Sequence, residues 1–337
     1  MQWIAACCGG TGDTRAFVLS AAFPLRRCPS ASPVPDLDRR TLEGLLLGVA
    51  SALLGGAWQV ATRQATTTHF APEQLALFRY GIPALLFLPL LLRTGLLPRA
   101  MPRSALALMV IGAGLPFGLV AMSGTRFAPA AHMGVLMAGA APLFAAAASW
   151  WLWRERPGAQ RSAGLALMAL GVAVLGAHTL ATIELRTLGG DALFLLAAAL
   201  WTGYTLSFRR SGLTPFQGAA LVNAWSLLLL LPVLLWRGVS FGDVPLAALV
   251  SQGMIQGVMA GVLGLWTFTA AIARLGPAGA AAFGAMVPVV TAVGAWAWLG
   301  ERPSAVDWLA IAAAVAGVAL ASGALPALRR VRTPRPA

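Results

Sequence analysis

Residues Pro142–Pro157 read PLFAAAASWWLWRERP, and residues Pro288–Pro303 read PVVTAVGAWAWLGERP. The first proline, a tryptophan eight residues later and the closing Glu-Arg-Pro recur at a constant offset of 146 in the numbering. Arg63 and Arg209 keep the same offset. Chance explains coincidences in one register poorly, so the chain contains an internal repeat. Each copy is an apolar run that ends at a charged Glu-Arg pair.

Apolar runs of this kind fill the chain from residue 44 to residue 328. A bilayer core about 30 Å thick needs about 20 apolar residues of helix. In lipid a helix satisfies its own backbone groups, whereas an open sheet does not. We therefore expect an all-α integral membrane protein with ten transmembrane helices. The expected spans are 44–62, 74–92, 104–125, 127–153, 162–183, 192–208, 211–236, 244–273, 275–300 and 308–328.

The composition excludes several classes of protein. Of the 337 residues, 58% are hydrophobic and 10% are charged, whereas about a quarter of an average soluble domain is charged. The net charge of +13 comes from arginines that lie a few at a time between apolar runs. A nucleic-acid-binding protein would instead gather them on one face. These features exclude a soluble domain, a disordered chain and a nucleic-acid partner, and they favour the lipid bilayer.

The arginines also predict the orientation, because short loops rich in arginine stay on the cytoplasmic side. With the N-terminus inside, 18 arginines fall in the cytoplasm, five outside, and one, Arg79, within a span. This bias predicts a multi-pass protein of the inner membrane with both termini in the cytoplasm. We expect residues 1–41 to form a disordered cytoplasmic N-terminal tail and residues 325–337 a basic cytoplasmic C-terminal tail.

The two repeats are expected at residues 42–180 and 188–324, with five helices each. Because five is an odd number, the second copy enters the membrane upside down. Inverted repeats are typical of secondary transporters, in which two pseudo-symmetric halves exchange inward-open and outward-open shapes around a central site. A duplicated bundle that is merely stable is the alternative. The inverted repeat, supported by the constant sequence offset, therefore favours transport by alternating access.

Several of these motifs resemble a known family. They are the paired Pro…Glu-Arg-Pro endings, Phe78-Arg79-Tyr80, the loop Gly124–Ala130 (GTRFAPA) and Arg274–Ala278 (RLGPA). Over about residues 42–324 the chain resembles a ten-helix, EamA-type member of the drug/metabolite transporter superfamily. The resemblance implies a metabolite or drug transporter, often an exporter, and no particular substrate. Small relatives carry a glutamate in the middle of helix one for proton exchange. Here Glu43 lies at its mouth, which puts that mechanism in doubt.

Two charged or titratable residues stand out within the spans. Arg79 is the only charge expected inside a span, and none of the eleven carboxylates is expected at mid-span. A charge at that depth costs about 2.5–3.5 kcal/mol on insertion scales. Arg79 is therefore either an anion site or gate, or an arginine that snorkels to the surface. His132 is either a proton site or a neutral, packed histidine.

Aromatic and amide side chains at mid-span are the other candidate substrate contacts. Tyr204 and Trp58 match at the same offset of 146, and pseudo-symmetric aromatics would flank a central cavity. Ordinary helix packing and interhelical hydrogen bonds are the alternative. Gln256 and Gln252 are four residues apart and share a helix face. The full set of candidate substrate-binding residues is Trp58, Gln59, Arg79, His132, Trp201, Tyr204, Asn223, Gln256 and Trp266.

The sequence contains no Walker loop, HExxH motif or Ser/His/Asp arrangement, which argues against an ATP-driven pump or a hydrolase. We expect no catalytic residue, metal or cofactor. The favoured function is a secondary transporter that exports a small metabolite or amphipathic compound. A structural or assembly subunit and a lipid-modifying enzyme are the alternatives. The sequence does not determine whether the protein forms a homodimer. The Glu155-Arg156 and Glu301-Arg302 pairs either pin loops or form gates.

Overall fold

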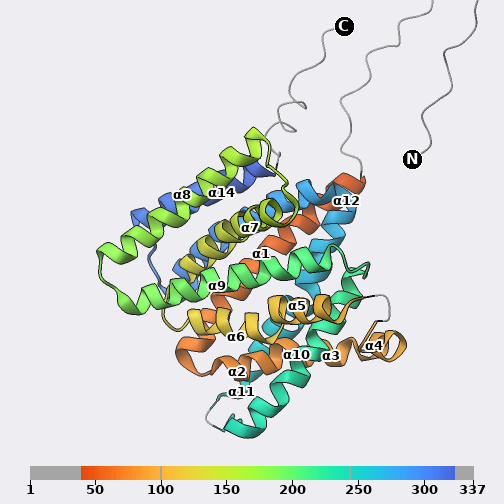
Figure 1. The fold of residues 1–337 in the computed structure, drawn as a ribbon. Helices are drawn as coiled ribbons and strands as arrows, with labels where there is room; N and C mark the ends of the chain where they lie inside the picture. Colours follow the sequence, from red (N-terminus) through yellow and green to blue (C-terminus); the bar gives the residue numbers. More distant parts are fainter. Residues whose placement is uncertain (1–38, 99–100, 243, 323–337) are drawn as a thin grey trace, which may run out of the picture. The chain divides into compact units, whose positions relative to one another are not determined.

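The computed structural model describes residues 39–98, 101–242 and 244–322. Every regular element in these ranges is a helix, and the ribbon is shown in Figure 1. The expected tails, 1–41 and 325–337, lie almost entirely outside the described residues. Only residues 39–41 are seen, and they form the start of a helix.

The first repeat contains long helices that proline and glycine interrupt. Pro83 and Pro89 stand at the first turns of two short helices, where a missing amide hydrogen costs nothing. The chain bends by 63° between these helices, at Phe87. The elements are α1 (Arg39–Thr68), α2 (Pro72–Ala76), the π-helix η1 (Leu77–Gly81), α3 (Ile82–Leu86), α4 (Leu88–Thr94), α5 (Arg103–Ala113), α6 (Leu115–Gly124), α7 (Ala130–Trp153) and α8 (Ala159–Ala181).

The second repeat follows the same order. Its first helix begins at Leu185, the repeat equivalent of Arg39, and its last begins at Ala305, the repeat equivalent of Ala159. The elements are α9 (Leu185–Phe208), α10 (Pro215–Arg237), α11 (Leu246–Gln252), the π-helix η2 (Gly253–Leu263), α12 (Gly264–Gly284), α13 (Met286–Gly294), the π-helix η3 (Ala295–Leu299) and α14 (Ala305–Ala321). The offset found in the sequence is therefore also an offset between helices.

The described residues contain seven helices that are long and apolar enough to cross a membrane, or eight if the bent pair Pro72–Leu86 and Leu88–Thr94 is one span. Two shorter apolar helices, Met286–Leu299 and Ala305–Ala321, follow. Each of the ten expected ranges is helical over most of its described residues. The all-helical class is thus confirmed, and the exact number of ten spans stays a prediction.

Packing between the repeats is reciprocal. Helix α1 packs on α13, and its counterpart α9 packs on α7, which is the same pair with the repeats exchanged. The two last helices, α8 and α14, lie side by side (Figure 1). A Cβ added at Gly164 of α8 would lie 2.6 Å from backbone atoms of Gly317 and Ala321 in α14. Such close approach of small residues is a main source of helix association in lipid.

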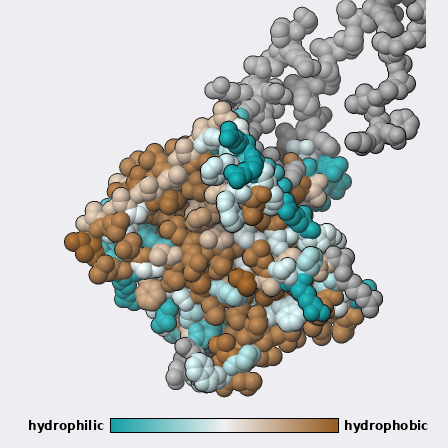
Figure 2. Space-filling view, viewed as in Figure 1, coloured by the Kyte–Doolittle hydropathy of each residue, from teal (hydrophilic) through white to brown (hydrophobic). Residues whose placement is uncertain are grey.

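The surface agrees with insertion into lipid. Figure 2 shows apolar residues over most of the visible face, with hydrophilic residues in smaller separate patches. Leucines and tryptophans are exposed on several helices, among them Leu92, Trp151, Leu235 and Trp236. In water an apolar surface of this extent would mark a binding interface. On helices long and apolar enough to cross a membrane, such a surface is expected to face the acyl chains of the bilayer.

Replacement of Gly164 by leucine should separate α8 from α14. The added side chain meets backbone rather than a flexible side chain, so we expect a loss of about 1–3 kcal/mol in the free energy of unfolding. Gly176 on the same helix has no heavy atom within 4 Å of an added Cβ, which makes Gly176→Leu the matched control. Thermal unfolding of the detergent-solubilised protein measures both. Equal stability of the two variants would contradict the tight contact.

Candidate functional site

A hydrogen-bond network joins α1 to η2 in the interior. The indole Nε1 of Trp58 donates to Oε1 of Gln256 at 2.8 Å. Gln256 Nε2 in turn donates to Thr62 Oγ1 at 3.0 Å and to Gln252 Oε1 at 3.3 Å. Gln256 is fully buried. A buried amide is costly unless it is hydrogen-bonded, so this network holds the two repeats in one register.

A second cross-repeat contact lies one residue further along α1. Thr291 of α13 donates its hydroxyl hydrogen to Gln59 Oε1 at 2.9 Å, and both side chains are buried. Trp58 and Gln59 therefore bond two different helices of the second repeat. Both of these polar residues, selected from the sequence, thus join the two halves of the protein.

Three aromatic rings of α9 and one of α6 form a row. The ring centroid of Trp201 lies 5.4 Å from that of Phe117 and 5.1 Å from that of Tyr204. Tyr204 stacks on Phe208 at 5.7 Å. We call Phe117, Trp201, Tyr204 and Phe208 the aromatic row. Phe117 is buried, whereas Trp201 is 37% exposed, so the row is accessible at Trp201, whose ring is large, apolar and polarisable.

Arg79 lies on η1, next to the π-helix η2 that carries Gln256. Its guanidinium lies 5.6 Å from the centroid of the Tyr80 ring. It also lies within electrostatic range of Tyr204, at the aromatic row. In the described part of the chain no carboxylate lies within 4 Å of it. π-Helical segments are frequent at functional sites, and here two of them meet beside a cation.

Two further predicted residues lie on other helices. Asn223 is buried in α10, and its amide donates to the Ala219 carbonyl one turn earlier at 2.8 Å. This bond lies within its own helix and does not reach the network of Trp58 and Gln256. Trp266 lies on α12 and is 44% exposed. Its substrate-binding role stays a prediction.

His132 lies at the start of α7 between two carboxylates. Its Nδ1 lies 2.8 Å from Oδ1 of Asp191 on α9, and its Nε2 lies 3.4 Å from Oδ1 of Asp307 on α14. Thr179 of α8 donates to Oδ2 of Asp191 at 3.1 Å. We call His132, Asp191 and Asp307 the histidine triad. It joins both repeats through three helices.

The end of the molecule at which α1 ends and α7, α9 and α14 begin is tied together by Glu301; we call it the Glu301 end. Oε1 of Glu301 lies 2.6 Å from Nε of Arg63. Its Oε2 accepts a hydrogen bond from the Ala130 amide at 2.9 Å. Arg63 also donates to the carbonyl oxygen of Thr125. One carboxylate therefore connects α1, the start of α7 and the connection before α14.

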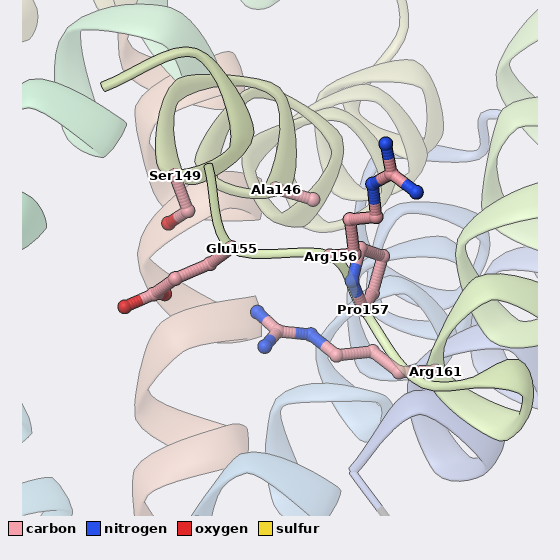
Figure 3. A pocket seen from close by; sticks show the side chains of 6 residues that line it. All are labelled: Ala146, Ser149, Glu155, Arg156, Pro157 and Arg161. Carbon is pink, nitrogen blue, oxygen red and sulfur yellow. The ribbon is translucent and has the colours of Figure 1, made fainter. Parts of the chain in front are cut away.

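The repeat-equivalent glutamate, Glu155, has different surroundings. It lies at the opposite end of α7, which we call the Glu155 end, beside a cavity of about 300 Å³. Arg161 extends from α8 into the space beside Ser149 and Glu155, whereas Arg156 points away (Figure 3). Within the described ranges Glu155 forms no ion pair within 4 Å. Ala146 and Pro157 also line this cavity.

Two carboxylates that the expected spans left outside, Asp191 and Asp307, lie within the first turns of helices. Helix α9 begins at Leu185, seven residues before the expected start, so Asp191 is buried in its second turn. Helix α1 likewise extends to Thr68 and includes Arg63. The expected spans were bounded at charged residues, and this rule necessarily placed Asp191 and Arg63 outside them. A signal was present: Ser304 and Asp307 have the spacing of a capping box, which predicts a helix start that includes Asp307.

Comparison with known proteins supports the repeat. The EamA-like transporter family model matches residues 42–177 and 188–323. A solved structure titled only as the crystal structure of a protein shares 20% identity at a TM-score of 0.55. The match covers 82% of this chain and 96% of that chain, and at this identity it shows the fold alone. No curated protein matches the chain.

The bond between Trp58 and Gln256 should show as an energetic coupling. Interhelical hydrogen bonds in membranes average about 0.6 kcal/mol in double-mutant cycles, so we expect Trp58→Phe and Gln256→Leu to couple by about this amount. Unfolding of the two single variants and the double variant in detergent measures it. Trp201→Phe with Gln256→Leu is the control cycle, for which we expect additivity. Equal coupling in both cycles would contradict the network.

Proposed function

This chain belongs to the EamA-like transporter family, and we propose that it is a secondary transporter that exports a small amphipathic metabolite across the inner membrane by alternating access. The observation that carries the proposal is a difference between its two ends. Glu301 is tied to Arg63, whereas the repeat-equivalent Glu155 lies beside a cavity and is not paired with Arg209 in the described structure. A transporter that closes one end at a time has this asymmetry.

In this proposal, the pair of Glu301 with Arg63 and the equivalent pair of Glu155 with Arg209 form alternate gates. The ends of α7 and α9 are close neighbours, since Arg210 lies 3.9 Å above the Trp153 ring. Glu155 and Arg209 lie next to these residues in the chain, as Glu301 and Arg63 lie near the contact of η3 with α1. Closing the Glu155 end would pair Glu155 with Arg209 while the pair at the Glu301 end opens.

The orientation follows from five helices in each repeat and from the arginine bias. Both termini then lie in the cytoplasm, the second repeat is inverted and the Glu301 end faces outward. The state described here is accordingly closed toward the outside. This arrangement uses the ten predicted spans, of which the bent Pro72–Thr94 segment is one.

Arg79 and the aromatic row suggest the chemical class of solute. A cation without a carboxylate partner inside a span is costly, and a solute with an anionic group would supply the missing charge. The adjacent aromatic row would pack against the apolar part of the same solute. Trp58, Gln256 and Gln59 supply hydrogen-bonding groups close to the junction of the repeats. The substrate we propose is a small anionic amphipathic metabolite.

A flux assay with reconstituted proteoliposomes tests the proposal. Thermal shift of the purified protein first ranks a panel of anionic amphipathic metabolites and their uncharged analogues. We expect stabilisation and flux for members of the anionic group. No flux for any stabilising solute would overturn the transporter. Product analysis of the same vesicles would show a lipid-modifying enzyme, and co-purification with an obligate partner would show an assembly subunit.

Arg79→Gln should reduce flux of the anionic solute by about tenfold or more, because a charge-assisted contact contributes about 1.5–3 kcal/mol. Flux of an uncharged analogue should change little. Arg93 lies on α4 of the same bent segment and its side chain is exposed, so Arg93→Gln is the matched control. Equal loss for charged and uncharged solutes would show that Arg79 has a structural role only.

Removal of the tie at Glu301 should open that end. In a variant with serine at Cys7, Cys8 and Cys28, a cysteine at buried Ala130 reports access to a thiol reagent. We expect Glu301→Gln to raise its reaction rate about fivefold or more, a typical size for a coupled change of state. Glu155→Gln should lower the rate, since it removes the pair of the opposite state. Equal rates in all three backgrounds would contradict alternate gates.

A further inference from the structure

We propose that the histidine triad is a proton-binding site that couples transport to a proton gradient. This inference rests on the proposed function. Its geometry, however, was not foreseen from the sequence, in which His132 stood alone as a titratable ring. The ligand is a proton, and the three side chains come from helices α7, α9 and α14.

Both ring nitrogens of His132 face carboxylate oxygens. A neutral imidazole carries one N–H and one lone pair, so it can donate to one aspartate only. Its lone pair then faces the other aspartate, unless that carboxyl group carries a proton. The side chains of His132, Asp191 and Asp307 are 7%, 5% and 13% exposed. The contacts are thus complete only in proton-loaded forms of the triad.

The number of bound protons determines the charge buried in the membrane. With a neutral imidazole and two carboxylates the triad carries a net charge of −2. One further proton, on His132 Nε2 or on Asp307 Oδ1, brings the net charge to −1 and completes the contact between these two atoms. Because an uncompensated buried charge is expensive, the loaded triad suits a closed, water-free end and the unloaded triad suits a hydrated, open end.

Asp307 is the group best placed to accept the proton. Its Oδ2 accepts a hydrogen bond from the Ser304 amide at 2.7 Å. Its Oδ1 is buried and has no hydrogen-bond partner in the described residues, although it lies 3.4 Å from His132 Nε2. Both oxygens of Asp191, by contrast, have hydrogen-bond partners, His132 and Thr179. A proton at Asp307 Oδ1 would therefore complete the network.

Other charges at this end are compensated or lie toward the surface. Arg63 and Glu301 neutralise each other. The described elements that pack against α7 are α1, α8, α9, α13 and α14. The remaining charged or titratable side chains that these elements and their connections bring to this end are half-buried or exposed: His69, Arg126, His178, Glu184, Arg186 and Arg302. Among the described residues of this end, the triad is therefore the buried group with an unbalanced charge.

The triad is connected to the tie at the Glu301 end. Glu301 bonds the Ala130 amide, and His132 follows two residues later on α7. Glu301 lies on the connection between η3 and α14, and Asp307 lies in the first turn of α14. A change in the charge of Asp307 or His132 therefore acts on the two segments that Glu301 holds together.

The site belongs to one end only. At the offset of 146 the equivalents of His132, Asp191 and Asp307 are Ala278, Leu45 and Arg161. The Glu155 end thus has a gate-like glutamate but no equivalent of the triad. An otherwise pseudo-symmetric protein would in this way respond to protons from one side of the membrane. In the proposed orientation that side is the outside.

A metal ion suits this geometry poorly. The two aspartates approach the imidazole from its two opposite nitrogens, so their oxygens do not converge on one point. No group of three or more His, Cys, Asp or Glu residues in the described ranges could hold a metal ion. The arrangement favours a proton over a cation held by convergent oxygen ligands.

Nitrogen NMR of His132 tests proton binding without any need for transport. The chain has three histidines, so His69→Gln with His178→Gln leaves His132 as the only one. We expect the chemical shifts of its ring nitrogens to change with pH. Asp307→Asn should alter that titration, although its amide oxygen can still accept a hydrogen bond from the Ser304 amide. A response to sodium chloride but not to choline chloride at constant pH would show a cation site instead. A pH-independent neutral ring, unaffected by Asp307→Asn, would overturn the proposal.

Flux in proteoliposomes tests the coupling. We expect an imposed pH gradient to drive solute movement, and Asp307→Asn or Asp191→Asn to reduce gradient-driven flux about tenfold while solute exchange at equal pH continues. His178→Gln, at a half-buried histidine of the same end, is the matched control and should retain coupling. Retained gradient-driven flux in both aspartate variants would overturn the coupling. If the unmutated protein showed no flux while its His132 still titrated in the NMR experiment, the proposed transport function would be rejected but the proton site would not.

Discussion

The hydrocarbon core of the membrane offers no water to polar groups, and this constraint shapes every buried contact in the protein. Backbone groups are satisfied within helices, and the few polar side chains in the interior must find partners across helices. Trp58 and Gln256 do so between repeats, as do Gln59 and Thr291. Where the described residues supply no carboxylate partner, as at Arg79, the cost marks a position at which function is the best explanation.

Duplication and asymmetry have separate consequences in this molecule. Duplication supplies equivalent helices and reciprocal packing, α1 on α13 and α9 on α7. Asymmetry appears where equivalent residues have different partners. Glu301 is tied to Arg63, while Glu155 lies beside a cavity. The same helical framework can therefore hold one end closed, and a transporter built from two repeats is expected to exchange the roles of the ends.

The predictable part of the fold rested on regular patterns. Apolar length and the constant offset indicated the helices and the repeat, because both follow from the bilayer and from duplication alone. Helix boundaries were less predictable. They were drawn at charges, and Asp191 and Arg63 therefore fell outside the expected spans although both lie within helices. Of the candidate site, Trp58, Gln59 and Gln256 were found as interior polar groups, whereas the hydrogen bond that Asn223 forms in the described structure lies within its own helix.

Composition, periodicity and repetition already identified a helical membrane protein with two related halves, because hydrophobic length is a local property of the chain. The partners of its polar groups required the tertiary structure. His132 belongs to the first repeat, whereas Asp191 and Asp307 belong to the second, and Arg63 and Glu301 are divided in the same way. Contacts between such distant parts of the chain depend on how helices from the two repeats cross, which no local pattern encodes. The histidine triad and the tie at Glu301 are products of that packing.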